Sequence, residues 1–84
     1  MFNTICKLES ITRENNSNNG NPNYTLVFYD DVAKLGLTLK TESDSMVAYK
    51  ISDTYLDKDC QIWYYYNDQG QAFLKDINKL DEEN

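Results

Sequence analysis

The amino-acid sequence predicts a small, mainly β protein in which five antiparallel strands form a barrel, with one short helix between the third and fourth strands. Two observations predict this fold class. Apolar and polar residues alternate along separate segments, as they do on strands with one face in the core. A capped helical pattern interrupts the alternation once, over residues 43–50. With 84 residues and a hydrophobic fraction of 40%, the chain forms a single domain, 1–84.

The first predicted strand covers residues 2–13. Cys6 and Leu8 share one face of a regular strand, whereas Ile11 falls on the other. One extra residue near Glu9–Ser10 would bring all three side chains to the same face. We therefore expect a β-bulge at that point.

Two further strands, 24–30 and 34–41, follow a polar loop at 14–23. The loop is rich in Asn and contains Gly and Pro, residue types that are common in turns. In the third strand three leucines alternate with polar residues, and we expect them to face the core: Leu35, Leu37 and Leu39. As a core truncation, Leu37→Ala is expected to cost about 2–5 kcal/mol.

Residues 43–50 have the pattern of a short helix. Thr41 followed three residues later by Asp44 resembles a capping box, and Ser43 is an alternative N-cap. Apolar residues then follow at helical spacing from Met46 to Ile51. We expect about two helical turns that close one end of the barrel.

A hairpin over residues 59–77 completes the predicted fold. Its first strand alternates regularly, and the turn that follows has Gly70 where a left-handed conformation is needed. We expect Phe73 and Ile77 to share one face of the return strand. The tail, 79–84, is expected to be frayed.

Three strands, a short helix and two strands form the element order of the OB-fold, a five-stranded barrel. The sequence therefore predicts an OB-like barrel. An SH3-like barrel is the alternative, although that fold usually has a single 3₁₀ turn late in the chain instead of a helix.

The charge is strongly acidic, with 14 Asp and Glu against 8 Lys and Arg and a net charge of −6. This balance disfavours non-specific binding to a phosphate backbone and favours a basic protein partner, or serves solubility alone. The N-terminal residues do not resemble a signal peptide, and no apolar run approaches the ~20 residues of a membrane span. We expect a soluble protein of the cytoplasm with no membrane partner.

The sequence contains few groups that carry chemistry. Histidine is absent, which removes the commonest general base and metal ligand. No glycine-rich phosphate loop is present, and Cys6 and Cys60 are too far apart in sequence for a CxxC metal motif. We expect the two cysteines to be small buried hydrophobic residues. We expect no catalytic residues, no metal site and no cofactor, so that the protein is not an enzyme.

Aromatic side chains are concentrated in the last hairpin. Trp63 and Tyr65 alternate with Tyr64 and Tyr66, so a core this small cannot hold all four. Cross-strand packing explains them most simply. The exposed ones would also suit a protein-binding patch or a stacking platform for single-stranded nucleic acid.

Acidic residues follow the predicted helix and the later loops. A compact surface of this charge could imitate the phosphates of DNA and occupy the basic groove of a nuclease, a repressor or a repair enzyme. The residues concerned are Glu42, Asp44, Asp53, Asp57, Asp59 and Asp68.

Two stretches, GNPNYTLVFYDD at 20–31 and LKTESDSMVAYKI at 39–51, carry a pattern of the form GNPxY, TxxDS and AYxI. In this pattern the chain resembles small uncharacterised proteins that bacteriophages and mobile elements encode. The resemblance covers most of the chain and implies a phage or mobile-element setting inside a bacterial host cell. Small acidic proteins in that setting often inhibit host machinery.

The sequence therefore favours a non-enzymatic binding protein, an acidic inhibitor or DNA mimic directed at a basic host protein that handles nucleic acid. The alternative is an OB module that binds single-stranded nucleic acid, and a further alternative is a structural or assembly protein of the phage particle. The predicted partner-binding residues are Glu42, Asp44, Asp53, Asp57, Asp59, Trp63 and Tyr65.

Overall fold

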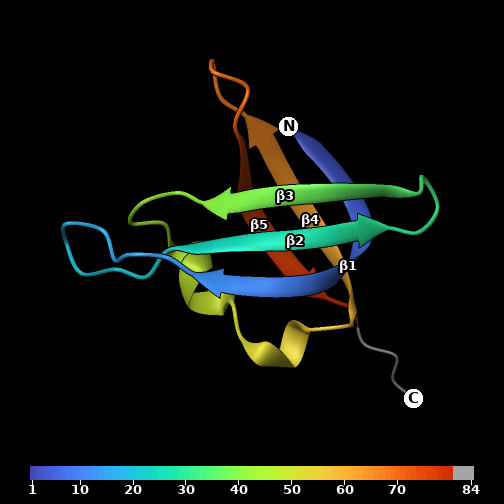
Figure 1. The fold of residues 1–84 in the computed structure, drawn as a ribbon, viewed down its shortest axis with the longest axis horizontal. Helices are drawn as coiled ribbons and strands as arrows, with labels where there is room; N and C mark the ends of the chain where they lie inside the picture. The colour runs from blue at the N-terminus through green and yellow to red at the C-terminus, as the bar shows by residue number, and fades with distance from the viewer. Residues whose placement is uncertain (81–84) are drawn as a thin grey trace.

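The computed structural model describes residues 1–80. Five strands close into one barrel in the order β1-β2-β3-β5-β4, and two short 3₁₀ turns connect β3 to β4 (Figure 1). The elements are β1 Phe2–Arg13, β2 Tyr24–Asp30, β3 Leu35–Thr41, η1 Met46–Lys50, η2 Asp53–Tyr55, β4 Asp59–Tyr66 and β5 Ala72–Lys79. The predicted mainly β barrel of five strands is confirmed. The predicted frayed tail overlaps β5 at its first residue, and residues 81–84 lie outside the described part of the chain.

The barrel is mixed, so the prediction of an entirely antiparallel sheet is wrong at one pair of strands. β3 and β5 run parallel and pair only through Lys40 with Phe73 and Thr41 with Leu74. The other four pairs of neighbouring strands are antiparallel. This closing contact joins segments about thirty residues apart, and local alternation carries no information about it.

β1 contains the predicted bulge. Its pairing with β2 shifts between Leu8 and Ser10, and beyond the shift Ile11 pairs with the buried Leu26. Ile11 therefore packs against the same core as Cys6. The bend lets one long strand pair with β4 along its first half and with β2 along its second half.

The leucines of β3 differ in burial, which corrects the expectation that all three face the core. Leu39 is fully buried, Leu37 is half-buried, and Leu35 is 63% exposed. All three have the same parity along the strand, so the difference lies in what covers them. β3 pairs with β5 only at its C-terminal end, and the start of β3 extends beyond the barrel toward the β2–β3 turn (Figure 1).

β5 contains a bulge that the sequence did not predict. Its pairing with β4 shifts so that Trp63 faces Asp76 and Tyr64 faces Leu74, which leaves Lys75 as the extra residue. Leu74 and Ile77 are therefore both fully buried, although they have opposite parity. The predicted sharing of one face by Phe73 and Ile77 is wrong for the same reason.

The helical segment is in the predicted position but is not an α-helix. η1 is a single 3₁₀ turn of five residues, in which the amide of Ala48 donates to the carbonyl of Ser45. The side chain of Ser45, and not that of Thr41 or Ser43, caps this turn by accepting from the amide of Val47. Five residues are too few for two α-helical turns, and the tighter 3₁₀ geometry is common in such short connections.

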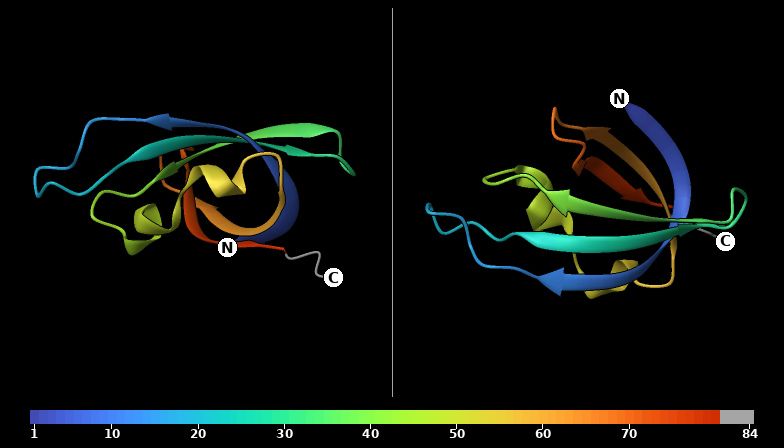
Figure 2. Two further views of the ribbon diagram at one scale, coloured as in Figure 1. Left: turned by 90° about the horizontal axis from the view of Figure 1, so that it is seen from below. Right: turned by 45° about the horizontal axis from the view of Figure 1, so that its top comes forward.

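Both 3₁₀ turns lie on the same side of β1 and β2, behind these strands in the view of Figure 1 and below them in the left view of Figure 2. η1 contributes Val47 and Ala48 to the buried interior, and Ile51 follows at its end. The connection from β3 to β4 thus covers part of the core.

The core is built almost entirely from apolar side chains. Each fully buried aliphatic or aromatic side chain stabilises the fold by roughly 1.5–3 kcal/mol. The core residues are Cys6, Leu8, Leu26, Phe28, Leu39, Val47, Ile51, Cys60, Ile62, Leu74 and Ile77. Over residues 1–80, no helix has the length and apolar character needed to span a membrane.

Candidate functional site

Two concave surfaces lie at opposite ends of β2 and β3. One is at the β2–β3 turn and the bend of β1, and we name it the acidic groove. The other lies between the loop at 14–23 and the β4–β5 turn, and we name it the loop pocket. β2 has seven residues, so the two ends are roughly 20 Å apart at about 3.3 Å per residue.

The acidic groove has a volume of about 590 Å³. Three neighbouring strands supply its walls, because Lys7 of β1 pairs with Asp59 of β4 on one side and with Tyr29 of β2 on the other. The residues that line it are Ile5, Cys6, Lys7, Glu9, Tyr29, Asp31, Val32 and Asp59.

Apolar side chains are exposed beside the acidic groove. Ile5 is 52% exposed and Val32 is 94% exposed. Val32 is held out by the tight turn after β2, where the carboxylate of Asp30 accepts hydrogen bonds from the amides of Val32 and Ala33 at 3.0 Å each. The turn therefore fixes the backbone at Val32 and presents its side chain to solvent at the edge of the groove.

Negative charge predominates in the acidic groove, where three carboxylates accompany the single cation of Lys7. Among residues 1–80, neither Glu9 nor Asp59 takes part in a salt bridge. Asp31 lies 3.9 Å from the ammonium group of Lys34, but both side chains are largely exposed. A pair of this kind is screened by solvent and contributes little, so the groove keeps most of its negative charge.

Asp57 and Asp59, two of the predicted binding residues, lie at this end of the barrel. Asp59 lines the acidic groove. Asp57 adjoins β1, since its amide donates to the carbonyl of Leu8 at 2.8 Å. Asp53 is exposed in η2, three residues before Leu56, which forms a β-bridge with Leu8 of β1.

Glu42 and Asp44 lie at the opposite end and are engaged in contacts within the protein. Asp44 accepts hydrogen bonds from Ser17 at 2.6 Å, from Asn19 at 2.9 Å and from Asn21 at 2.7 Å. These bonds favour the ionised form and lower the pKa of Asp44. Glu42 accepts a hydrogen bond from the hydroxyl of Tyr65. The structure therefore does not bring together all the acidic residues that the sequence singled out.

Trp63 and Tyr65 both face outward from β4 and are half-buried. Trp63 lies opposite Asn3 of β1 and Asp76 of β5. Tyr65 stacks on Phe73, with 5.8 Å between ring centroids and 26° between planes. The two predicted aromatic residues therefore have different surroundings, and only Tyr65 belongs to an aromatic pair.

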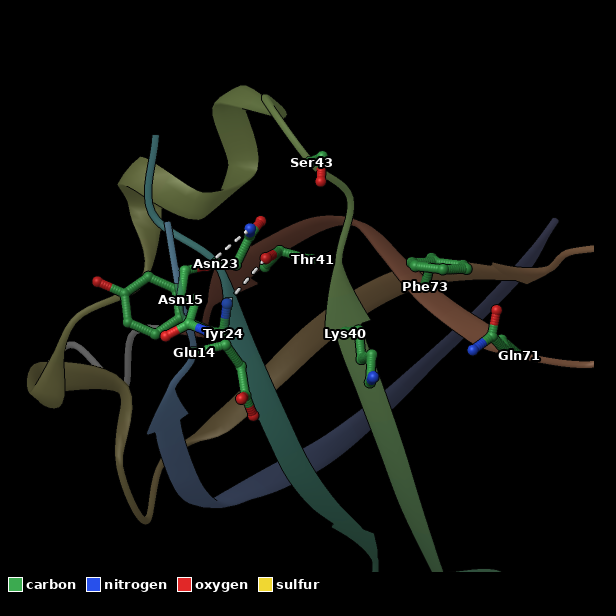
Figure 3. Close-up of a pocket in the computed structure, with 9 residues that line it drawn as sticks. All are labelled: Glu14, Asn15, Asn23, Tyr24, Lys40, Thr41, Ser43, Gln71 and Phe73. Carbon is green, nitrogen blue, oxygen red and sulfur yellow. Dashed lines mark hydrogen bonds between the residues drawn. The ribbon is translucent and has the colours of Figure 1, made fainter. Parts of the chain in front are cut away.

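The loop pocket has a volume of about 360 Å³. Figure 3 shows Lys40 between the loop residues on one side and Phe73 and Gln71 on the other. Amide and hydroxyl groups dominate its lining, with an aromatic ring at each side. The lining residues are Glu14, Asn15, Asn23, Tyr24, Lys40, Thr41, Ser43, Gln71 and Phe73.

The loop side of this pocket is well ordered by polar contacts. The amide of Asn23 donates to the carbonyl of Asn15 at 3.1 Å, and the hydroxyl of Thr41 accepts from the backbone amide of Tyr24 at 3.0 Å. The side-chain oxygen of Asn23 is the one buried side-chain polar atom of residues 1–80 that has no hydrogen-bond partner. A buried acceptor without a hydrogen bond destabilises the fold. Asn23 therefore lies at the pocket with an acceptor that is free to take a hydrogen bond.

Sequence reasoning missed Glu9 and Asp31 in the acidic groove, and the polar lining of the loop pocket. One signal was available for the groove, because Ile5 has the opposite parity to Cys6 and was therefore an apolar residue on the outer face of a predicted strand. No comparable signal pointed to the loop pocket, which joins residues from three distant segments.

Within the described part of the chain, no group of three or more Cys, Asp or Glu residues could hold a metal ion. Comparison of the chain with protein-family models, with curated proteins and with solved structures finds no match.

Proposed function

We propose that this protein is a non-enzymatic, OB-like binding module that recognises a basic protein partner through its acidic groove. The strand order β1-β2-β3-β5-β4, with helical turns between β3 and β4, supports the OB-like assignment over an SH3-like barrel. The observation that carries the function is the acidic groove itself, which is lined by three carboxylates and by the exposed apolar side chains of Ile5 and Val32.

The chemistry of the groove favours a segment rich in Lys and Arg. Glu9 and Asp59 offer carboxylates that form no salt bridge with a side chain of residues 1–80. Ile5 and Val32 offer apolar area against which the aliphatic part of a Lys or Arg side chain can pack. A net charge of −6 would also speed the encounter with a positively charged protein.

A host protein that handles nucleic acid is the partner that best fits this chemistry. Such proteins bind phosphates through grooves lined with Lys and Arg, and an acidic surface competes for the same groups. The resemblance to phage and mobile-element proteins supports the same setting, in which the protein acts in the cytoplasm of a bacterial host. The proposed role is that of an acidic inhibitor. Of the partner-binding residues that the sequence predicts, Asp57 and Asp59 belong to the proposed binding surface.

The proposal is tested by capture of host proteins on immobilised protein, followed by elution with duplex DNA. Glu9→Gln combined with Asp59→Asn removes two charges from the groove. Asp53→Asn combined with Asp68→Asn removes two charges elsewhere and is the matched control, because both pairs change the net charge equally. The wild type and the control should retain a protein that DNA displaces, and the groove variant should lose at least nine-tenths of it, roughly the loss of one strong contact.

A second variant separates the contribution of apolar contacts to partner binding from that of charge. Val32→Ser leaves the net charge unchanged and should still weaken retention, because it removes an exposed apolar contact. Equal retention by the groove variant and the wild type would refute the acidic groove as the binding surface. Retention that DNA does not displace would refute competition with nucleic acid.

A further inference from the structure

β3 has an unpaired edge over residues 35–39, and we propose that a second copy of this chain pairs with this edge, so that two barrels join in a symmetric dimer. β3 pairs with β2 along residues 35–40, but with β5 only at Lys40 and Thr41. Within residues 1–80, no strand pairs with the other side of residues 35–39, and we name this side the free edge (Figure 1). Dimerisation through the free edge does not require the function proposed for the acidic groove.

The hydrogen bonds of β2 show which backbone groups of β3 lie at the free edge. The amide of Glu14 donates to the carbonyl of Asn23, so the backbone of Asn23 faces β1. The amide of Tyr24 donates to a hydroxyl at the end of β3, so the next residue along faces β3. Adjacent residues alternate in this way, and the pairing of β2 with β3 has no register shift. The amide and carbonyl groups of Gly36 and Thr38 therefore point away from β2, to the free edge.

The free edge is complementary to itself. When two β3 strands pair antiparallel with Leu37 on the two-fold axis, Gly36 of each copy lies opposite Thr38 of the other. Each of these two pairs exchanges two backbone hydrogen bonds, so every amide and carbonyl group that the two residues present is matched. The strands β1, β2 and β3 of one barrel and those of the second copy then form one continuous sheet.

Apolar side chains are exposed beside the free edge. Leu35 is 63% exposed, Phe2 is 53% exposed and Tyr66 is 50% exposed. The rings of Phe2 and Tyr66 meet edge-on, with 5.7 Å between their centroids. They border the same opening of the barrel as the start of β3, because Thr4 of β1 donates to the carboxylate of Asp30, which pairs with Leu35. Exposed apolar groups that cluster in this way mark an interaction surface.

Charge favours a second copy of this chain as the occupant. Residues 35–39 contain no charged residue and no proline, the residue types that discourage pairing at a sheet edge. The turn before them carries Asp30, Asp31 and Lys34, an excess of one negative charge, and Lys34 lies 3.9 Å from Asp31. The antiparallel pairing brings Lys40 of the second copy beside this turn, and Lys40 forms no salt bridge within residues 1–80. Each end of the paired strands is therefore electrically balanced.

The test is sedimentation velocity of the whole chain over a range of protein concentration. The free edge is roughly 17 Å long at about 3.3 Å per residue, so the interface is small and the dimer should be weak and reversible. Concentrations from about 10 μM to about 1 mM cover weak association of this kind. The mean mass of the wild type should rise with concentration toward that of two chains. The amides of Gly36 and Thr38 should also exchange with solvent more slowly at the higher concentrations.

Thr38→Pro tests the hydrogen bonds of the free edge. It removes an amide that no strand of residues 1–80 pairs with, so the barrel should stay folded, as thermal melting at low concentration can verify. The dissociation constant of the dimer should rise by about tenfold or more, because two of the four backbone hydrogen bonds are lost. Thr38→Val keeps the amide and is the matched control, which should associate as the wild type does. Leu35→Lys leaves the backbone unchanged, places a charge on an exposed apolar side chain and should weaken the dimer severalfold.

Three outcomes would overturn the proposal. The first is the mass of a single chain at every concentration. The second is equal association of the wild type with both Thr38→Pro and Leu35→Lys. The third is growth beyond two chains, because a two-fold contact closes on itself and only a head-to-tail contact continues. The Glu9→Gln, Asp59→Asn variant should associate as the wild type does, and loss of association in that variant would place the contact in the acidic groove instead.

Discussion

The carboxylate of Asp44 accepts a hydrogen bond from the side-chain amide of Asn21, with 2.7 Å between Oδ1 and Nδ2, and so ties the loop at 14–23 to the segment after β3. Ser17 and Asn19 of the same loop donate to the same carboxylate. Asp44 itself has a left-handed backbone, with φ at +64°. One acidic side chain therefore organises a ten-residue loop that borders the loop pocket.

Replacing Asp44 with Ala should loosen the loop without unfolding the barrel. The three donors would lose their shared acceptor, and water can replace it because all three hydrogen bonds are exposed to solvent. We expect faster amide hydrogen exchange at Ser17 and Asn21 and unchanged exchange in β4. Asp68→Ala, in the β4–β5 turn, is the control. Unchanged exchange at Ser17 and Asn21 would show that Asp44 does not hold the loop.

The same contact should depend on pH with a defined sign. Hydrogen bonds from Ser17, Asn21 and Asn19 lower the pKa of Asp44 in the folded chain below the unfolded value of about 3.9. The hydrogen bonds to Asp44 are therefore fully present above the unfolded pKa of about 3.9. They are lost as the pH falls through the lower pKa that Asp44 has in the folded chain. NMR shifts of the Asn19 and Asn21 side-chain amides should follow this titration, and they should lose it in Asp44→Ala.

The burial of the β3 leucines predicts a graded mutational series. Leu39→Ala should destabilise the protein by about 2–5 kcal/mol, because Leu39 is fully buried. Leu35→Ala should change the free energy of unfolding by less than about 0.5 kcal/mol, because Leu35 is largely exposed. Leu37→Ala should fall between them, below the core value that the sequence predicted. Chemical denaturation measures all three, and equal losses would contradict the observed burial.

These examples show which parts of the fold could be predicted from the sequence. The bulge in β1 was predictable because Cys6 and Ile11 have opposite parity within one segment. The bulge at Lys75 was not, because both Phe73 and Leu74 are apolar and either could face the core. The exposure of Leu35 depends on where β5 stops pairing with β3, which is a property of the assembled barrel and not of the strand.

The candidate sites were less predictable for a similar reason. Asp59 was identified from its charge, and it lies in the acidic groove. Asp44 was identified on the same ground, yet its partners are more than twenty residues away in sequence and turn it into a structural contact. Charge alone cannot separate these two roles, because the difference lies in which donors the fold brings to each carboxylate.

The ion pair of Lys50 with Asp76 links η1 to β5, with 2.7 Å between Nζ and Oδ1. Both side chains are more than one-third exposed, so solvent screening limits the effect of Lys50→Ala to about 1 kcal/mol or less. The hydrogen bond from Lys50 is the main cause of the lowered pKa of Asp76. Stability from this pair is present above about pH 3.9 and is lost as pH falls through the lower, folded pKa. Thermal melts from pH 2 to 5 should show a smaller pH dependence in Lys50→Ala than in the wild type, and equal dependence would contradict the assignment.

Cys6 and Cys60 lie directly opposite each other on β1 and β4, and both are free and buried. Burial is the main cause that raises the pKa of Cys6 to about 12 and that of Cys60 to about 11. The thiol of Cys60 also donates to the carbonyl of Lys58 at 3.4 Å. Both thiols should therefore resist alkylation in the native protein near pH 8 and react fully in denaturant, because the thiolate is the reactive form. Mass spectrometry after brief iodoacetamide treatment distinguishes these states, and rapid labelling of the native protein would contradict the observed burial.

The raised thiol pKa values also predict a loss of stability at alkaline pH. A thiol in the unfolded chain ionises near pH 8.5, whereas the folded chain keeps both protons until about pH 11 or 12. The contribution of the two protonated thiols to stability should therefore be fully present below about pH 8.5. It should fall as the pH rises toward the pKa values of the folded chain, since ionisation favours the unfolded state. Tyr and Lys side chains titrate in the same range, so the Cys60→Ala variant provides the comparison. Between pH 8.5 and 10.5 this variant should lose less stability than the wild type, by up to about 1.4 kcal/mol per pH unit. Equal losses in the two proteins would show that Cys60 is not held as a thiol in the core.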